Sequence, residues 1–247
     1  VALTNNYIEN SYNAVSVESI GSNNSIAVQI IGNRIIKPYN TAVFTRLVGT
    51  GGNLYRGSNI SNNYFEDVGK TAIKFTAPIG AVSGDMELAT ISGNEIKGYA
   101  FNVISAGILV ACDDSDSGSI TLDEIIVTNN IVDGHGTSGT STALGTSIAA
   151  RGIRVQNVNN TIVSDNIINN CVSDGLVIAR ATNVSATGNI LFNNNTNNVG
   201  FGNIYLQDVT KGEINALSYD AGFGDGILLY QSREIRVTGS YNDNPGY

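Results

Sequence analysis

The sequence contains no tryptophan, three prolines, two cysteines and one histidine. Charged residues make up 14%, with 13 Lys and Arg against 21 Asp and Glu, which gives a formal net charge of −8. Because phosphate binding needs a basic face, this balance argues against a nucleic-acid partner. The longest apolar runs, such as residues 107–110, are far too short to span a membrane, so no membrane partner is expected.

The small numbers of cysteine and histidine residues argue against two further kinds of site, a disulfide framework and a metal site built from several histidines. Cys112 and Cys171 cannot form a disulfide framework, and both fall in strand or turn positions where a small buried thiol is expected; a disulfide between them is the less favoured alternative. His135 is the only histidine, which excludes a metal site built from several histidines. No metal or other cofactor is therefore expected.

Glycine and asparagine are abundant instead. The 28 Gly residues accompany 42% apolar residues, a mixture typical of many short strands joined by tight turns rather than of helices. A turn of the form Asn/Gly/Asp-Asn-x-apolar recurs every 23 to 36 residues. Its second residue, used here as the marker, is Asn6, Asn33, Asn63, Asn94, Asn130, Asn166 and Asn189. Degenerate copies are predicted at residues 212–215 and 239–242.

Short strands flank every marker. An alternating strand precedes it, as in residues 26–30, 125–128 and 235–238, and a second strand follows it. The second strands are expected at residues 14–17, 72–75, 107–110, 152–155, 175–178, 203–206 and 226–229. One repeat cannot bury its own apolar side, but stacked repeats pair their strands in parallel and form a continuous core. Asn suits the turns because it tolerates a left-handed backbone and can stack its amide on the next Asn.

A β-sandwich is the alternative fold, but it would not place Asn in the same context in each repeat. The pattern resembles the pectate-lyase-like superfamily, which includes polygalacturonases, polysaccharide lyases and bacteriophage tailspike depolymerases. The resemblance covers Asn5 to about Asn242 and implies an all-β, right-handed, single-stranded parallel β-helix, a solenoid of about eight or nine coils. We expect residues 1–247 to form one such domain. Since the chain starts at Val1 without Met or a signal peptide, we expect it to be a fragment of a longer protein.

Alternation sorts each second strand into an inward and an outward side. The inward pairs are Val15/Val17, Ile73/Phe75, Ile108/Val110, Ile153/Val155, Leu176/Ile178, Ile204/Leu206 and Ile227/Leu229. One outward column is Ser16, Phe44, Lys74, Leu109, Arg154, Val177, Tyr205 and Leu228, and the other is Glu18, Arg46, Thr76, Ala111, Gln156, Ala179, Gln207 and Tyr230. The candidate substrate-binding residues for an extended, partly anionic glycan are Arg46, Lys74, Arg154, Gln156, Tyr205, Gln207 and Tyr230.

Long insertions border this outward face. Residues 47–58, 77–89 and 112–124 follow equivalent strands, so we expect them to wall one side, and residues 135–150 lead into the next strand. Glycoside hydrolysis needs two carboxyl groups that flank the scissile bond. The candidate catalytic residues are Asp113, Asp114, Asp116, Asp133 and His135. For Asp174 and Asp225 the prediction is a solvated turn residue.

Fragments of the polygalacturonase pattern occur in the correct order. They are the pair Asp113-Asp114, the element Gly134-His135-Gly136, and Arg154 with Gln156 where that family has Arg-x-Lys. The sequence departs from the family's pattern at three points: the upstream Asn-Thr-Asp element is absent, Gln156 replaces the lysine, and Gly134-His135-Gly136 falls in a turn. Residues 114–118 weakly resemble a calcium loop but lack the distal Glu, so calcium is the alternative to no cofactor.

The sequence therefore predicts a polysaccharide-degrading protein, a hydrolase ahead of a lyase or epimerase, that acts on an acidic bacterial capsular or exopolysaccharide. A non-catalytic glycan-binding adhesin or structural solenoid is the alternative from another class. The resemblance to tailspikes implies a homotrimer and an extracellular or virion-associated location. Such a homotrimer would also allow sites that are shared between subunits.

Overall fold

The computed structural model describes residues 1–20, 25–48, 54–77, 86–99, 105–112, 122–134, 150–196, 201–221 and 224–242. All regular secondary structure in these ranges is β-strand, and every strand pairing is parallel. A β-sandwich is thereby excluded as the fold of these ranges, because its sheets are antiparallel. The same ranges contain no helix that is long and apolar enough to cross a membrane.

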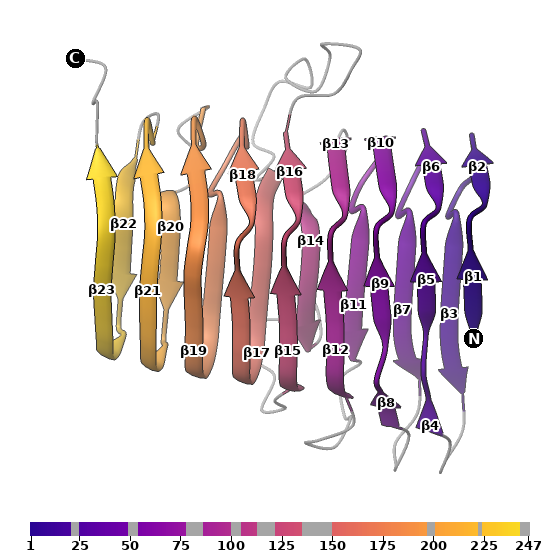
Figure 1. Cartoon of the computed structure of the whole chain (residues 1–247), viewed down its shortest axis with the longest axis horizontal. Helices are drawn as coiled ribbons and strands as arrows, with labels where there is room; N and C mark the ends of the chain where they lie inside the picture. Colours follow the sequence, from indigo (N-terminus) through magenta and orange to yellow (C-terminus); the bar gives the residue numbers. More distant parts are fainter. Residues whose placement is uncertain are drawn as a thin grey trace.

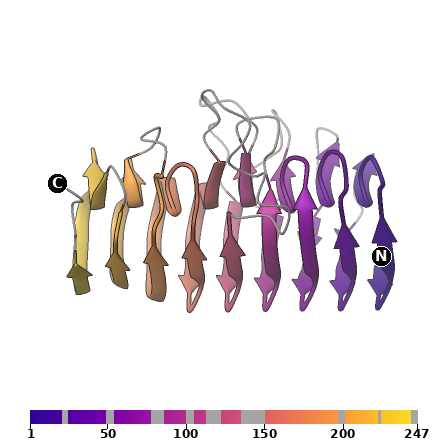
Figure 2. The same cartoon turned by 90° about the horizontal axis from the view of Figure 1, so that it is seen from above.

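The strands stack along the long axis in chain order and form three parallel ladders (Figures 1 and 2). The first ladder contains β1 (Ala2–Thr4), β5 (Gln29–Ile31), β9 (Asn59–Ser61), β12 (Met86–Ser92) and β15 (Leu122–Thr128), with β4 (Ser25–Ile26) and β8 (Leu54–Arg56) extending it. It continues through parts of the long strands β17 (Ala150–Ser164), β19 (Leu176–Phe192), β21 (Thr210–Tyr219) and β23 (Arg233–Asn242).

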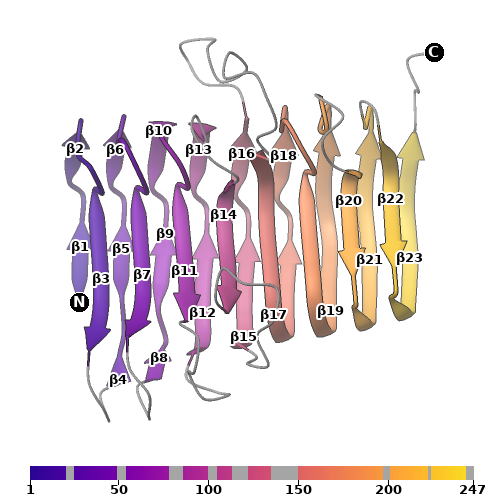
Figure 3. The same ribbon diagram turned by 180° about the vertical axis from the view of Figure 1, so that it is seen from behind.

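The other two ladders follow each marker. The second contains β2 (Tyr7–Glu9), β6 (Arg34–Ile36), β10 (Tyr64–Val68), β13 (Glu95–Tyr99), β16 (Ile131–Asp133) and β18 (Ile167–Asn169), and then the ends of β19, β21 and β23. The third, on the near side of Figure 3, contains β3 (Val15–Ile20), β7 (Val43–Val48), β11 (Ile73–Ala77), β14 (Ser105–Cys112), the starts of β17 and β19, β20 (Gly202–Gln207) and β22 (Asp225–Tyr230). The third ladder carries the predicted outward columns.

The marker asparagines form one continuous hydrogen-bonded row at the turn between the first two ladders. In its centre, Asn63 donates from its backbone N–H and its amide to Asn94 Oδ1, at 3.1 and 2.9 Å, and Asn94 donates likewise to Asn130. Each such amide also donates to a backbone carbonyl of the preceding repeat, as from Asn94 to Ile60 at 2.9 Å. The predicted stacking of Asn amides is thus confirmed from Asn6 to Asn189.

Two neighbouring residues have different roles in this turn. The left-handed backbone belongs to the residue before the marker, with a φ of 56° at both Asn62 and Asn129. At Gly93, in the same position, φ is 63°, a value that glycine adopts without a Cβ penalty. The marker Asn therefore supplies the hydrogen bonds, and its predecessor reverses the chain.

The degenerate markers were predicted wrongly. Asn189 pairs in register with Ala216 and then with Gly239, whereas Gly212 pairs with Val184 in the middle of a strand. The register shifts between Thr187 and Asn189, because β21 passes this point without the extra turn residue of the earlier repeats. The row of amides consequently ends at Asn189.

The core is one continuous cluster of apolar side chains from all three ladders. The inward residues predicted from Ile73 to Leu206 are all fully buried. Leu229 was predicted to be buried but is 42% exposed, because β22 is the last described strand of its ladder and nothing described packs beyond it. Cys171 is a free, buried thiol as expected, while the side chain of Cys112 lies outside the described residues.

Candidate functional site

The strand register confirms the alignment of both predicted columns, but their outward exposure is confirmed only in part. The buried members are Thr76, Ala111, Gln156, Val177, Ala179 and Tyr205. Lys74 pairs with Phe44 on one side and with Leu109 on the other, and Leu109 pairs with Arg154. The remaining members of the two columns follow in the expected order. The alternation of short strands was therefore sufficient to align residues that are tens of positions apart.

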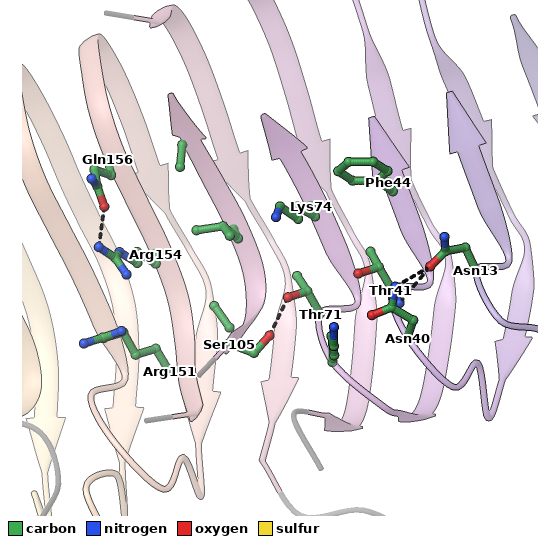
Figure 4. A pocket seen from close by; sticks show the side chains of 14 residues that line it. Asn13, Asn40, Thr41, Phe44, Thr71, Lys74, Ser105, Arg151, Arg154 and Gln156 are labelled. Carbon is green, nitrogen blue, oxygen red and sulfur yellow. Dashed lines mark hydrogen bonds between the residues drawn. The ribbon is translucent and has the colours of Figure 1, made fainter. Parts of the chain in front are cut away.

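A pocket of about 480 Å³ lies on this face of the third ladder (Figure 4). Its described lining residues are Asn13, Asn40, Thr41, Phe44, Lys70, Thr71, Lys74, Ser105, Ala106, Leu109, Ala111, Arg151, Arg154 and Gln156. Four of them are cationic and none is acidic. The pocket, which we call the basic groove, therefore favours anions despite the net charge of −8 of the whole chain.

Local contacts orient two of the cations. Arg154 donates a hydrogen bond through Nη2 to Gln156 Oε1, two residues along β17. Lys74 Nζ lies 5.6 Å from the centre of the Phe44 ring, a cation–π contact across the ladder. Gln156 was predicted to face solvent, but it is buried, and its contact with the guanidinium of Arg154 gives it a positioning role.

A third cation is held by a buried carboxylate. Arg151 Nε lies 3.4 Å from Asp174 Oδ2, and Asp174 is completely buried. Asp174 Oδ1 also accepts hydrogen bonds from the backbone N–H groups of Phe201 and Gly202. The prediction of a solvated turn residue at Asp174 was wrong, because these donors and Arg151 satisfy its charge inside the fold; Asp225 is exposed as expected.

Arg151 and Lys70 were missed among the candidate binding residues. Arg151 precedes Gly152-Ile153, and Asp174 precedes Gly175-Leu176 in the next repeat. Because Ile153 pairs with Leu176, these two positions are neighbours across the ladder. Extending the column alignment by two residues toward the N-terminal end of each strand would have revealed the ion pair.

Uncharged polar groups line the rest of the groove. Asn40 Nδ2 donates to Asn13 Oδ1 at 2.9 Å, and the Thr71 and Ser105 hydroxyls share a hydrogen bond. Figure 4 shows Asn13 and Asn40 at one end of the groove, Arg151 and Arg154 at the other, and Lys74 between them. Amides and hydroxyls next to cations are suited to a polyhydroxylated anion.

The remaining predicted binding residues lie outside this lining. Arg46 is exposed and pairs with Thr76, while Gln207 and Tyr230 continue the second column toward the C-terminus. Tyr205 was expected at the surface but is only 8% exposed, because its ring packs 4.3 Å from that of Phe201. Burial raises the pKa of the Tyr205 hydroxyl. Of the seven predicted residues, the groove thus brings together Lys74, Arg154 and Gln156.

The candidate catalytic residues are mostly beyond the described ranges. Asp113, Asp114, Asp116 and His135 lie outside them, as does the whole calcium-like segment of residues 114–118. Asp133 belongs to β16 in the second ladder, where it pairs with Lys97 and Asn169, and its Oδ1 accepts a 2.9 Å hydrogen bond from Asn170. Asp133 therefore does not line the groove formed on the third ladder.

No cluster of three His, Cys, Asp or Glu side chains suited to a metal ion occurs in the part of the chain that the structure describes. Comparisons of the sequence with models of protein families, of the sequence with curated proteins and of the structure with solved structures gave no match. The function is therefore argued from the geometry of the basic groove.

Proposed function

We propose that the chain binds an acidic polysaccharide in the basic groove of a right-handed parallel β-helix with about eight or nine coils. The observation that carries this proposal is the convergence of Lys70, Lys74, Arg151 and Arg154 on one elongated pocket, with no acidic side chain among its described lining residues. Strands of neighbouring repeats are about 4.8 Å apart, so a linear polymer can present successive groups to successive repeats. The amides and hydroxyls of Asn13, Asn40 and Ser105 would receive its hydroxyl groups.

The anion is better explained as a glycan than as a nucleic acid. The whole chain carries a formal net charge of −8, which disfavours a long, dense polyanion. A polysaccharide carries fewer charges along its length and many hydroxyls. We infer that the groove receives such a moderately charged chain.

Hydrolysis is the cleavage reaction that we propose first. Asp113, Asp114 and Asp116 follow directly on β14 in the sequence, and β14 contributes Ala106, Leu109 and Ala111 to the groove. One carboxyl group would protonate the glycosidic oxygen, and a second would activate water or attack the sugar. Asp133, which lies on another ladder, is the weakest of the acidic candidates.

Elimination is the second reaction that a specific observation favours. The described lining offers cations and no carboxylate, as required to neutralise the carboxylate of a uronic acid. A basic side chain would then remove the proton next to that carboxylate, a C=C bond would form, and the glycosidic C–O bond would break with the oxygen leaving. The products would be unsaturated and would absorb in the ultraviolet.

Binding is tested with two double variants of equal charge. Lys74→Gln with Arg154→Gln removes two groove cations, and Arg233→Gln with Arg236→Gln removes two exposed cations of β23. We expect the first variant to lose most of its affinity for acidic polysaccharides in affinity electrophoresis and the second to keep it. Equal losses of affinity in both variants would show that the net charge of the chain, and not the groove, causes the binding.

Cleavage is tested by following reducing ends and ultraviolet absorbance together on a panel of acidic polysaccharides. Reducing ends alone indicate a hydrolase, and both signals together indicate a lyase. Asp114→Asn should abolish turnover by a hydrolase but preserve binding, with Asp225→Asn as the exposed control. Binding without either signal would leave the glycan-binding adhesin as the function.

A further inference from the structure

The cations of the basic groove come from alternate repeats. Lys70 and Lys74 belong to the repeat of β11, and Arg151 and Arg154 belong to the repeat of β17. The repeat of β14 lies between them, because β14 pairs with β11 on one side and with β17 on the other.

The described lining residues of the intervening repeat carry no charge. They are Ser105, Ala106, Leu109 and Ala111. Leu109 stands in register between Lys74 and Arg154, and Ala106 stands in register beside Arg151. On the other side of β11, the repeat of β7 contributes Asn40, Thr41 and Phe44, which are also uncharged.

Along the ladder, the described lining residues therefore alternate by repeat: those of β7 are neutral, those of β11 cationic, those of β14 neutral and those of β17 cationic. With about 4.8 Å per repeat, the two cationic steps are roughly 10 Å apart. An extended pyranose chain advances by a length similar to one repeat for each sugar. A chain that lies along the groove would thus meet cations at every second sugar.

We propose that the preferred ligand is a glycan built of disaccharide repeats in which an acidic sugar alternates with a neutral one. The acidic sugars face Lys70/Lys74 and Arg151/Arg154, and the neutral sugar between them rests on Leu109. A polymer that is acidic at every sugar would place a carboxylate against Leu109, where it loses water without gaining a charged partner. This inference rests on the proposed binding function and specifies its substrate class.

The contacts of the two arginines support such spacing. Arg151 is held by buried Asp174, and Arg154 is held by Gln156, so both guanidinium groups are oriented before a ligand binds. Fixed donors select the spacing of anions more strictly than mobile ones, because they cannot move to meet a displaced charge.

The experiment compares hyaluronan, in which glucuronate alternates with an uncharged amino sugar, with polygalacturonate, which is acidic at every sugar. Dissociation constants are measured at fixed ionic strength with oligosaccharides of equal length. We expect the wild-type chain to prefer the alternating oligosaccharide by about tenfold, which corresponds to one well-placed charge contact.

A substitution at the neutral step is the decisive variant. Leu109→Lys places a cation between Lys74 and Arg154 and should raise affinity for polygalacturonate more than for hyaluronan, while Leu109→Gln should not. Thermal unfolding verifies that both variants fold, and the preference of the wild-type chain tests the inference even if neither does.

The outcomes separate this inference from the binding function. If the wild-type chain binds polygalacturonate as well as hyaluronan or better, and Lys74→Gln with Arg154→Gln abolishes that binding, the alternation is overturned and the binding function stands. If neither oligosaccharide binds, nor any acidic polysaccharide of the panel, both proposals fail.

Discussion

Asp174, completely buried at the start of one repeat, lies 3.4 Å from Nε of Arg151, which lines the basic groove one repeat earlier. The same carboxylate accepts hydrogen bonds from the backbone N–H groups of Phe201 and Gly202 in the following repeat. One side chain thus links three successive repeats and orients a groove cation. A residue that looks like an ordinary turn aspartate therefore supports both the fold and the site.

Asp174→Asn is expected to lower the free energy of unfolding by roughly 3 kcal/mol, since it leaves Arg151 facing a neutral amide at a buried position. Affinity for an acidic glycan should fall as well, because the guanidinium is no longer held. Urea unfolding and affinity electrophoresis measure the two effects. Asp225→Asn is the control at an exposed turn-flanking site. Unchanged stability in Asp174→Asn would contradict the role assigned to the buried carboxylate.

Asn94→Ala is expected to destabilise the fold by roughly 3 kcal/mol. It removes the acceptor for the backbone N–H and amide of Asn63 and the donor to the Ile60 carbonyl, all of which are buried. Asn6→Ala, at the exposed first position of the row, should cost well under half as much. Chemical denaturation of both variants provides the comparison, and equal losses would argue against burial as the cause.

Cys171 and Tyr99 should make the protein sensitive to alkali. Burial raises the pKa of the Cys171 thiol to about 12 from its ordinary value of 9.0, and burial likewise raises the pKa of Tyr99, whose hydroxyl lies 3.2 Å from Cys171 Sγ. Both groups are neutral when protonated, so the folded state keeps protons that the unfolded state releases. The stabilisation is complete below the unfolded pKa values and is lost as the pH rises from about 9 toward 12.

Unfolding followed at pH 8, 9, 10 and 11 checks this expectation. In Cys171→Ala the fall in stability with pH should be less steep, and the native wild-type thiol should resist alkylation at pH 8 until denaturant is added. Rapid alkylation of Cys171 in the native protein would show that the thiol is accessible and would refute the burial argument.

Glycan affinity should decrease as salt increases. At an ionic strength of 0.1 M the screening length is about 10 Å, and at 1 M it is about 3 Å, so the attraction between groove cations and an anionic chain weakens. The Lys74→Gln with Arg154→Gln variant should show a flatter dependence than the Arg233→Gln with Arg236→Gln control. Titrations at several salt concentrations measure the slopes, and an affinity independent of salt would indicate that apolar contacts dominate.

The repeat and the alternation within strands predicted much of this structure. They gave the parallel stacking of strands, the row of amides from Asn6 to Asn189, and the order of residues along both outward columns. These features depend on local rules: side chains alternate along a strand, and Asn and Gly reverse the chain. Local rules failed for the marker expected at residues 212–215, because the register shifts between Thr187 and Asn189, and for Leu229, because the described ladder ends there.

The composition of the groove was predicted only in part. Lys74, Arg154 and Gln156 were identified from their column, but Arg151, Lys70 and the hydroxyl pair of Thr71 and Ser105 were not. These residues precede the regular strand pattern, so alternation alone does not assign them a side. The exposure of Gln156 and Tyr205 was also misjudged, because contacts made over the strand surface are not encoded in its periodicity.

The sequence by itself determined which residues of the third ladder stand in register, since a repeated unit with alternating side chains stacks in parallel in one consistent alignment. Only the tertiary structure decided that Asp174 is buried against Arg151 and that four cations share one groove whose described lining has no acidic side chain. Those facts depend on the distance and shielding between side chains of different repeats. Burial changes the energy of a charge far more than its position in the sequence does, and burial exists only once the repeats have packed.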